Sequence, residues 1–423
     1  MCDRKIIDAA IKRYETSAKQ NPKKTLNVLD VIENKLKATN ISGDEVVPFV
    51  RHLMKTKFSI KVNFDGDRIL FISTGNDVKT TTYNYINEVR NECNGLIVAA
   101  NTWKPLVVPP KKLRSTYNAD NVNTNINQGL YRFYKVKEGT TVNLYYSDKW
   151  IISTTNGYDM NNVKWNQNTY QENFTKCISG LSLTWESFTA QLEQHKCYTF
   201  GFRTSDIHKF QTTDDIWFIQ SVNLCPVDDD YLWANDTSPI ASIKTQEMID
   251  IYEENINNCS DLVKITSKSI DNYLNTKEIN LGYIIRAVNN KIVGSDTDII
   301  IESDLFKFIK NTWYDNPVIK YCNENKIDRD SFITLNYLLE HYLDNSNTYA
   351  IELFQSIFPD YQDLIDEYME KIEDVVESFK EETPHLKLKA IIDNKMISTH
   401  KMIKEFVFNK TNTALIYMLV IKE

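Results

Sequence analysis

Glycine is scarce in this chain of 423 residues. Only 11 glycines occur, well under the roughly 7% of an average protein, and no two of them stand closer than nine positions apart. The patterns G-x-G-x-x-G and G-x-x-x-x-G-K-[ST] are therefore absent. Their absence excludes a Rossmann dinucleotide site and a P-loop, so a protein of this sequence that handles nucleotides would need a different scaffold.

Cysteine pairs and long apolar runs are lacking as well. The seven cysteines are an odd number, are scattered, and form no C-x-x-C pair, which disfavours a disulfide framework and a zinc ribbon and indicates reduced, buried thiols. His195 and Cys197 alone make a poor metal site, so no metal ligand is predicted. The sequence has no run of 18 apolar residues and no signal-peptide core, and we expect a cytoplasmic protein without a membrane span.

The charge of the chain is unevenly distributed. The formal net charge is −8, which is not the balance of a protein that coats DNA. Residues 104–137 nevertheless contain seven basic residues and one acid, whereas residues 360–382 contain ten acids and two lysines. The acids of the second stretch lie opposite an apolar stripe of helical spacing, which predicts an amphipathic helix with a solvated face.

The basic stretch 104–137 also carries Tyr117, Tyr131, Phe133 and Tyr134. Cations that follow phosphates and rings that stack on bases would suit RNA or another single-stranded nucleic acid. The alternative is a pair of strands whose aromatic side chains fill the core, and this alternative is favoured for Tyr131 and Phe133 individually.

The order of patterns predicts an α+β fold with antiparallel sheets. Helical spacing runs through residues 1–55. From Phe58 apolar and polar residues alternate as far as Phe64, a turn follows at Asp65-Gly66, and the apolar run at 69–72 completes the pattern of a hairpin. Further strand patterns follow, with helical patterns near 169–194 and 244–258. After about residue 304 the chain becomes helical. We expect a mainly helical segment at 1–55, a sheet domain at 56–320 and a C-terminal helical domain at 321–423.

The stretch from Arg132 to Asp159 contains the candidate chemistry. It has a lysine at the end of a strand, then Glu-Gly-Thr and two more strands. A lysine amine attacks phosphorus only when it is deprotonated, and burial or a neighbouring cation favours that form. Lys135 and Lys137 are both candidate nucleophiles, and the turn at Gly139 would let a nucleotide approach the backbone. A simple hairpin turn remains the alternative.

The order of these segments resembles the RNA ligase branch of the covalent nucleotidyltransferases, a superfamily that includes ATP-dependent ligases and mRNA capping enzymes. The similarity is greatest to ligase-like proteins of phages and large DNA viruses, and it spans roughly residues 85–315. It rests on these segments: RNECNGLIVAANTWKPLVVPPKKL, YKVKEGTTVNLYY, CYTFGFRTSDIHKF, INLGYIIR and TDIIIESDLFKFIKNTWYD.

The resemblance implies a nucleotidyltransferase fold, ATP as the nucleotide, magnesium, and RNA ends as the partner, in the host cytoplasm if the protein is viral. In such enzymes a lysine attacks the α-phosphate of ATP, and AMP then passes to an RNA 5′-phosphate. Lys135 or Lys137 would be the catalytic lysine. The resemblance implies nucleotide-binding roles for these residues: Arg90, Lys112, Glu138, Gly139, Arg203 and Arg286.

The chain departs from the family pattern at several charged positions. Where the family has its lysine, three residues before the glycine, this chain has Val136. Gly201 stands in place of an acid, and Leu281 stands in place of a glutamate. The last motif offers residues 299–303 (IIIES) instead of two lysines, with Lys307 and Lys310 further on. Two hypotheses follow: an active ATP-dependent RNA ligase or nucleotidyltransferase, and a catalytically inactive ligase-like module that binds RNA or a protein.

Overall fold

A computed structural model of the protein describes residues 26–74, 85–165, 167–206, 208, 210–211, 213–224, 243–249, 256–287, 298–313, 322, 326, 328–342 and 348–380. The first 25 residues of the expected N-terminal helical segment, residues 381–423 of the expected C-terminal domain, Cys2 and Cys225 lie outside these ranges. The chain forms two compact units, the first made by residues 1–273 and 278–304 and the second by residues 274–277 and 305–423.

Unit 1 begins with sheet A, whose strand order is β1-β2-β3-β4. The predicted hairpin is confirmed, because its two strands pair in antiparallel register from Ile60↔Ser73 to Phe64↔Ile69. Apolar residues on one face of each of three helices bury against this sheet. The strands are β1 (Ile60–Phe64), β2 (Arg68–Ser73), β3 (Asn94–Ala99) and β4 (Pro105–Val107), and the helices are α2 (Asn27–Thr39), α3 (Val46–Phe58) and α4 (Tyr85–Glu92).

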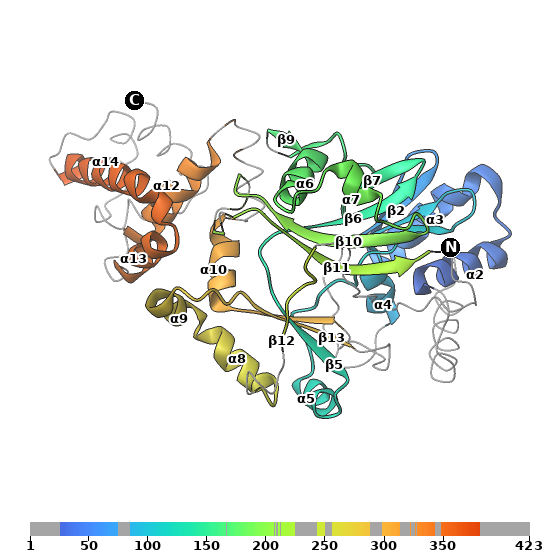
Figure 1. The fold of residues 1–423 in the computed structure, drawn as a ribbon, viewed down its shortest axis with the longest axis horizontal. Helices are drawn as coiled ribbons and strands as arrows, with labels where there is room; N and C mark the ends of the chain where they lie inside the picture. Colours follow the sequence, from blue (N-terminus) through green and yellow to red (C-terminus); the bar gives the residue numbers. More distant parts are fainter. Residues whose placement is uncertain are drawn as a thin grey trace, which may run out of the picture. The chain divides into compact units, whose positions relative to one another are not determined.

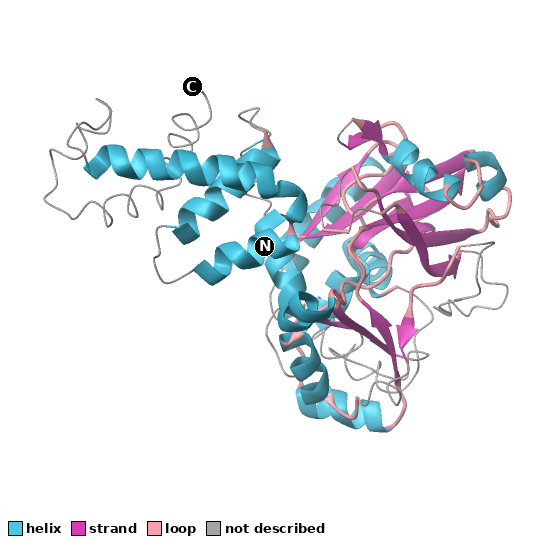
Figure 2. Cartoon of the chain, turned by 60° about the vertical axis from the view of Figure 1, so that its left-hand side comes forward, coloured by secondary structure: helices cyan, strands magenta, loops and turns pink. Residues whose placement is uncertain are grey.

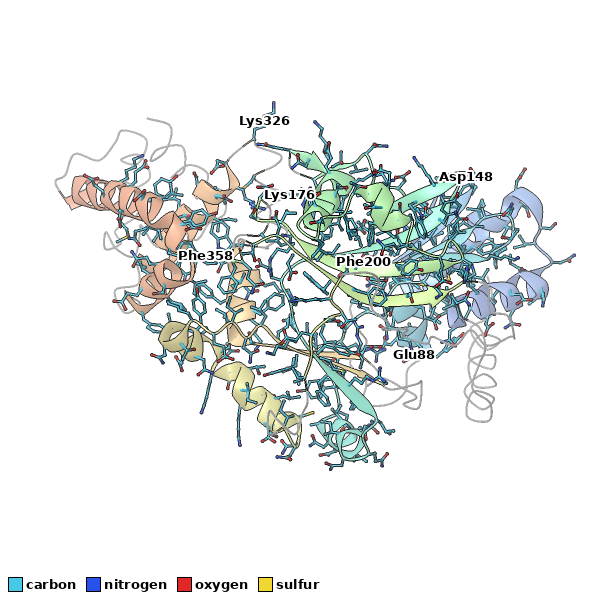
Figure 3. All side chains as sticks on the ribbon, viewed as in Figure 1. Glu88, Asp148, Lys176, Phe200, Lys326 and Phe358 are labelled. Carbon is cyan, nitrogen blue, oxygen red and sulfur yellow. The ribbon has the colours of Figure 1, made fainter. Side chains whose placement is uncertain are left out.

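Sheet C has the strand order β11-β10-β6-β7, with every pair antiparallel. One face packs on two helices through a cluster of rings that includes Phe200, which is fully buried (Figure 3). The other face contributes Tyr145, Ile151 and Cys197 to the core shared with sheet A. The elements are β6 (Thr140–Ser147), β7 (Lys149–Ser153), β10 (Lys196–Arg203), β11 (Asp215–Asn223), α6 (Tyr170–Ser179) and α7 (Trp185–Thr189) (Figure 1).

Sheet B has the strand order β12-β5-β13-β14 and is also antiparallel. Alternate residues of its strands, including Tyr131, Phe133 and Ile285, form a core with apolar residues of α5 and α8. The favoured alternative for Tyr131 and Phe133 is therefore confirmed. The elements are β5 (Tyr131–Lys135), β12 (Met248–Ile249), β13 (Gly282–Ala287), β14 (Asp298–Glu302), α5 (Ala119–Asn127), α8 (Cys259–Ser267) and α9 (Ser269–Thr276). A small hairpin, β8 (Lys164–Trp165) with β9 (Asn168–Thr169), accompanies the sheets.

The helical pattern expected near 244–258 is wrong for its described residues. Met248 and Ile249 pair with Tyr134 and Phe133 as an edge strand, and the Gln246 amide donates to the carbonyl of Phe218. Ladder hydrogen bonds to two neighbouring strands outweigh a weak local preference for helix here. The next helix, α8, begins only at Cys259.

Unit 2 is helical in its described residues, as expected after residue 304 (Figure 2). Trp313, Phe354 and Phe358 pack against one another, with ring centroids 5.0 to 6.1 Å apart; Trp313 and Phe354 are stacked, and Phe358 meets Trp313 edge-on. The elements are α10 (Asp304–Trp313), α12 (Arg329–Tyr342), α13 (Thr348–Ile357) and α14 (Gln362–Lys380). Antiparallel sheets together with segregated helices confirm the α+β class.

The described cysteines are free and buried, as expected: Cys93, Cys177, Cys197, Cys259 and Cys322. Within the described ranges no helix is both long enough and apolar enough to cross a membrane.

Glu92 ties α4 to the first turn of α2 and provides a test of this packing. Its carboxylate accepts hydrogen bonds from the Val28 amide at 3.0 Å and from Asn27 Nδ2 at 2.7 Å. Burial is the main cause that raises the pKa of this carboxyl from 4.5 to about 7. The folded state therefore holds a proton more tightly than the unfolded chain, so this group lowers the free energy of unfolding as pH rises from about 4.5 to 7.

We expect Glu92→Gln to remove that part of the pH dependence. As pH rises from 5 to 7, the unfolding midpoint of wild type should fall steadily relative to that of Glu92→Gln. Denaturant unfolding at a series of pH values measures this, with the exposed Glu33→Gln as the control. A pH-independent difference would show that Glu92 does not titrate in this range.

Candidate functional site

The chain passes directly from sheet B to sheet C at the segment predicted to carry the nucleophile. Strand β5 ends at Lys135, and Val136 still donates from its amide to the carbonyl of Gly282 in β13. Strand β6 begins at Thr140, which pairs with Phe202 of β10. The four residues 136–139 therefore form the link between the two sheets, which we call the B–C junction.

Lys135 lies on the sheet B side of this junction. Its Nζ is 3.0 Å from Glu247 Oε1, and the two side chains are 41% and 52% exposed. Such an exposed pair contributes about 0–1 kcal/mol of stability. The Lys135 side chain is thus engaged at the sheet edge formed by β12.

Lys137 lies on the sheet C side and is less exposed, at 24%. Its Nζ is 3.2 Å from Asp215 Oδ2 and 5.1 Å from the centroid of the Trp217 ring. Arg203 Nη2 approaches the same Asp215 oxygen at 3.7 Å. Two of the predicted cations therefore share one carboxylate at the start of β11.

The other residues predicted around the junction are held by the loop that joins β10 to β11. Glu138 is buried and accepts from the amide of Gln211 at 3.0 Å. Arg203 is buried as well; its Nε donates to the carbonyl of Thr213 at 2.9 Å, and its Nη1 donates to Gln211. This loop fixes both predicted side chains beside Lys137.

Trp217 is a residue of this site that the sequence reasoning missed. A Cβ atom built on Gly139 would lie 2.3 Å from the indole, and one built on Gly201 would lie 2.2 Å from it. The indole therefore lies directly on the two glycines and is itself only 4% exposed. Gly201 stands where the sequence resemblance implies an acid, and the ring occupies the space into which a side chain at 201 would extend.

We expect Gly201→Ala to destabilise the fold by about 1–3 kcal/mol, because the added methyl group must displace the tightly packed indole of Trp217. The cost should largely disappear in the Trp217→Ala background, where the space is free. Denaturant unfolding of the single and double variants tests this, with Gly180→Ala as the control because Gly180 has φ −59° and its nearest contact is at 3.4 Å. Equal costs of Gly201→Ala in both backgrounds would contradict the close contact.

Arg286 lies on the face of sheet B that is opposite the α5–α8 core. It is 8% exposed, its guanidinium carbon lies 5.5 Å from the centroid of the Tyr134 ring, and its Nε is 3.9 Å from Asp298 Oδ1. Burial is the largest cause that raises the pKa of the Asp298 carboxyl, and Arg286 acts in the opposite direction. Arg286 and Lys135 belong to adjacent strands, because Tyr283 of β13 pairs with Lys135.

The basic stretch that contains Lys112 is tied to its surroundings by buried acids. Lys111 Nζ and Arg114 Nη2 lie 3.8 and 3.7 Å from the Glu88 carboxylate, whose pKa is raised by burial despite these two cations. Lys112 donates from its amide to the carbonyl of Asn91 at 3.3 Å and is half-buried. The stretch thus runs from α4 to the edge of sheet B, where Arg114 bridges to Ile299.

Arg90 has a different setting from the other predicted residues. It is buried, and its Nε donates to the carbonyl of Phe58 at 2.6 Å while its Nη2 is 3.1 Å from Ser59 Oγ. These partners lie at the C-terminus of α3, where a cation satisfies carbonyls that the helix leaves open. The structure thus brings together Lys137, Glu138, Gly139 and Arg203, and it holds Arg90 against α3.

Sequence comparison places the chain beside proteins of a large DNA virus. No family model matches the chain. It is 25% identical over 318 residues to a protein of African swine fever virus named "Putative RNA-ligase", and 24% identical over 315 residues to the counterpart from another isolate. Each match covers 68% of this chain but only 66% of the relative, slightly less than two thirds of its length. These relatives confirm the resemblance indicated by the motifs.

Solved structures show weaker likenesses. An archaeal ATP-dependent RNA ligase is 8% identical with a TM-score of 0.37, covering 93% of this chain and 83% of its own. An ATP-dependent DNA ligase of Aquifex aeolicus, itself named putative, is 7% identical with a TM-score of 0.34, covering 79% and 80%. A Naegleria gruberi RNA ligase with PPi is 9% identical with a TM-score of 0.29, covering 46% and 56%. All three TM-scores are below 0.5, so these likenesses carry no further argument.

Proposed function

We propose, from the relationship to viral RNA ligase-like proteins, that this chain binds ATP and RNA ends at the B–C junction and accepts AMP on Lys137. The observation that carries the proposal is the arrangement at the junction, where a half-buried amine shares one carboxylate with a buried arginine beside a glycine. Lys135 is the second candidate for the nucleophile, and its greater exposure, 41% against 24% for Lys137, makes it the weaker one.

The covalent step balances with the groups at the junction. The Lys137 amine attacks the α-phosphorus of ATP, a P–N bond forms, and the P–O bond to pyrophosphate breaks. The proton leaves the amine to Asp215, whose carboxylate already accepts a hydrogen bond from Nζ at 3.2 Å. In the second step an oxygen of the RNA 5′-phosphate attacks the same phosphorus, the P–N bond breaks, and Asp215 returns its proton to the lysine nitrogen, which leaves as the free amine. Arg203 stands 3.7 Å from Asp215 and supplies a cation for the phosphates.

A divalent cation is compatible with this proposal even without a complete set of protein ligands. The described residues contain no group of three or more His, Cys, Asp or Glu side chains that could hold a metal. Magnesium characteristically keeps several waters and takes one or two carboxylates together with substrate phosphates. At the junction Glu138 is the carboxylate that would hold it, and it would neutralise charge on the phosphate oxygens.

RNA is the proposed second substrate, in the cytoplasm of a host cell. Arg132 and Lys104 are exposed and Lys111 and Lys112 are half-buried, so cations of the basic stretch can reach a phosphate backbone. The aromatic side chains contribute less than the sequence suggested, because Tyr131, Phe133 and Tyr134 are all buried. Backbone contacts by cations, rather than stacking of bases, would then hold the strand.

One observation favours a second candidate function, a ligase-like module without catalysis. Trp217 fills the space above Gly201, where the family pattern has an acid. A missing charge of this kind costs several kcal/mol of transition-state stabilisation in other active sites, by analogy about 3–4 kcal/mol. Such a module would still bind RNA through the basic stretch.

The experiment that separates the two functions follows the α-phosphate of ATP. The full chain is incubated with α-labelled ATP and magnesium, denatured at neutral pH to preserve a P–N bond, and examined for retained label. Addition of RNA carrying a 5′-phosphate should then move the label to the RNA. Label that is absent with ATP, while RNA binding persists, would reject AMP transfer and support the non-catalytic module.

A further inference from the structure

Strand β11 contacts the amine of Lys137 through two residues. Asp215 and Trp217 stand two positions apart, so their side chains leave the same face of the strand. The Asp215 carboxylate lies 3.2 Å from Nζ, and the centroid of the Trp217 ring lies 5.1 Å from it. The ring distance is within the range of a cation–π contact, which extends to about 6 Å.

The position of the indole is determined by the two glycines below it. Gly201 pairs directly with Trp217 across the ladder, and Thr141 of β6 pairs with Gly201 on the other side. Any side chain at 139 or 201 would overlap the ring, since the built Cβ atoms lie 2.3 and 2.2 Å from it. At 4% exposure the ring has almost no contact with solvent, and this boxed position makes it a rigid support.

We propose that Trp217 is a positioning residue for Lys137: its ring, with Asp215, holds the amine at the B–C junction. A lysine side chain is a long flexible stem, and a reacting group misplaced by about 1 Å can lose about 100-fold in rate. The ring restricts that freedom without bonding to the substrate. The kinetic part of the inference rests on the proposed function.

The kinetic test compares AMP-adduct formation in three variants. Trp217→Leu should slow adduct formation at saturating ATP by about 10- to 100-fold, while the ATP concentration at half-maximal rate changes by less than about 3-fold. Trp217→Phe keeps a ring face and should recover most of the rate. Trp150→Leu is the matched control, because it removes a half-buried indole from β7 of the same sheet and should leave the rate near that of wild type.

A second measurement tests the contact without using activity. The unfolding midpoint in urea is measured for Lys137→Met in the wild-type, Trp217→Phe and Trp217→Leu backgrounds. Lys137→Met should shift the midpoint most in wild type, less with Phe and least with Leu, because the ring contact that it removes weakens in that order. If Trp217→Leu does not fold, the Phe background supplies the comparison.

The outcomes separate the inference from the proposed function. A wild-type protein that forms no adduct would reject AMP transfer, whereas unequal midpoint shifts would still support the contact between Trp217 and Lys137. Equal shifts in all folded backgrounds would overturn the inference. Equal rate losses in Trp217→Phe and Trp217→Leu, or an equal loss in Trp150→Leu, would also overturn it, since a general loss of packing would then explain the effect.

Discussion

Lys137→Ala is expected to reduce retained AMP label on the order of 1,000-fold, because it removes the nucleophile itself. Lys135→Ala should keep label within about 3-fold of wild type, since its amine pairs with an exposed glutamate at the sheet edge. Both variants replace a lysine by alanine, and the two positions are two residues apart in the same segment. Each variant therefore serves as the control for the other.

The measurement is the initial rate of label retention per mole of folded protein. Circular dichroism and the unfolding midpoint establish that both variants remain folded. The converse pattern, with label lost in Lys135→Ala and kept in Lys137→Ala, would move the nucleophile to the sheet B side. Label that survives in the double variant would exclude both lysines.

Gly282→Ala is expected to destabilise unit 1 by about 3 kcal/mol or more, the largest stability effect that we predict for a single methyl group. Gly282 has φ +115°, a conformation that side chains rarely adopt, and an added Cβ would lie 2.1 Å from the carbonyl oxygen of Ile301. That oxygen belongs to the backbone of β14, whose register with β13 pairs Gly282 with Glu302. Relief therefore requires the two strands to separate locally.

Denaturant unfolding measures the effect of Gly282→Ala, again with Gly180→Ala as the tolerated substitution. A domain with a total stability of about 5–15 kcal/mol would lose a large fraction of it. An unchanged midpoint would show that β13 and β14 do not approach each other as closely as the structure indicates.

Local patterns in the sequence were sufficient to predict most of the longer strands. The alternation from Phe58 to Phe64, the turn at Asp65-Gly66 and the apolar run at 69–72 correspond to β1 and β2, because such patterns report which side chains face a core. The segment 244–258 failed for the opposite reason. Its strand pairs Met248 with Tyr134, more than a hundred residues away in the chain, and a local pattern carries no information about such a partner.

The site was predictable in its location and less so in its contacts. The Lys-x-Lys-Glu-Gly sequence located the B–C junction, since strand patterns flank it on both sides. The contact of Trp217 with Gly139 and Gly201 depends on the register of three strands, which the sequence does not specify. The sequence does place a tryptophan in the strand that follows the strand containing Gly201. This order indicates a contact between them only when the register of the two strands is known.

The most direct test of the central claim is to locate AMP on the chain by tryptic peptide mapping. Trypsin cuts after lysine and arginine but not after a lysine that carries AMP. Modified Lys137 would therefore yield the adducted peptide 136–149, VKEGTTVNLYYSDK, whereas modified Lys135 would yield the peptide 133–137, FYKVK. We predict the adduct in peptide 136–149 after incubation with ATP and magnesium. Adduct in peptide 133–137, or no adduct in either peptide, would contradict AMP transfer to Lys137.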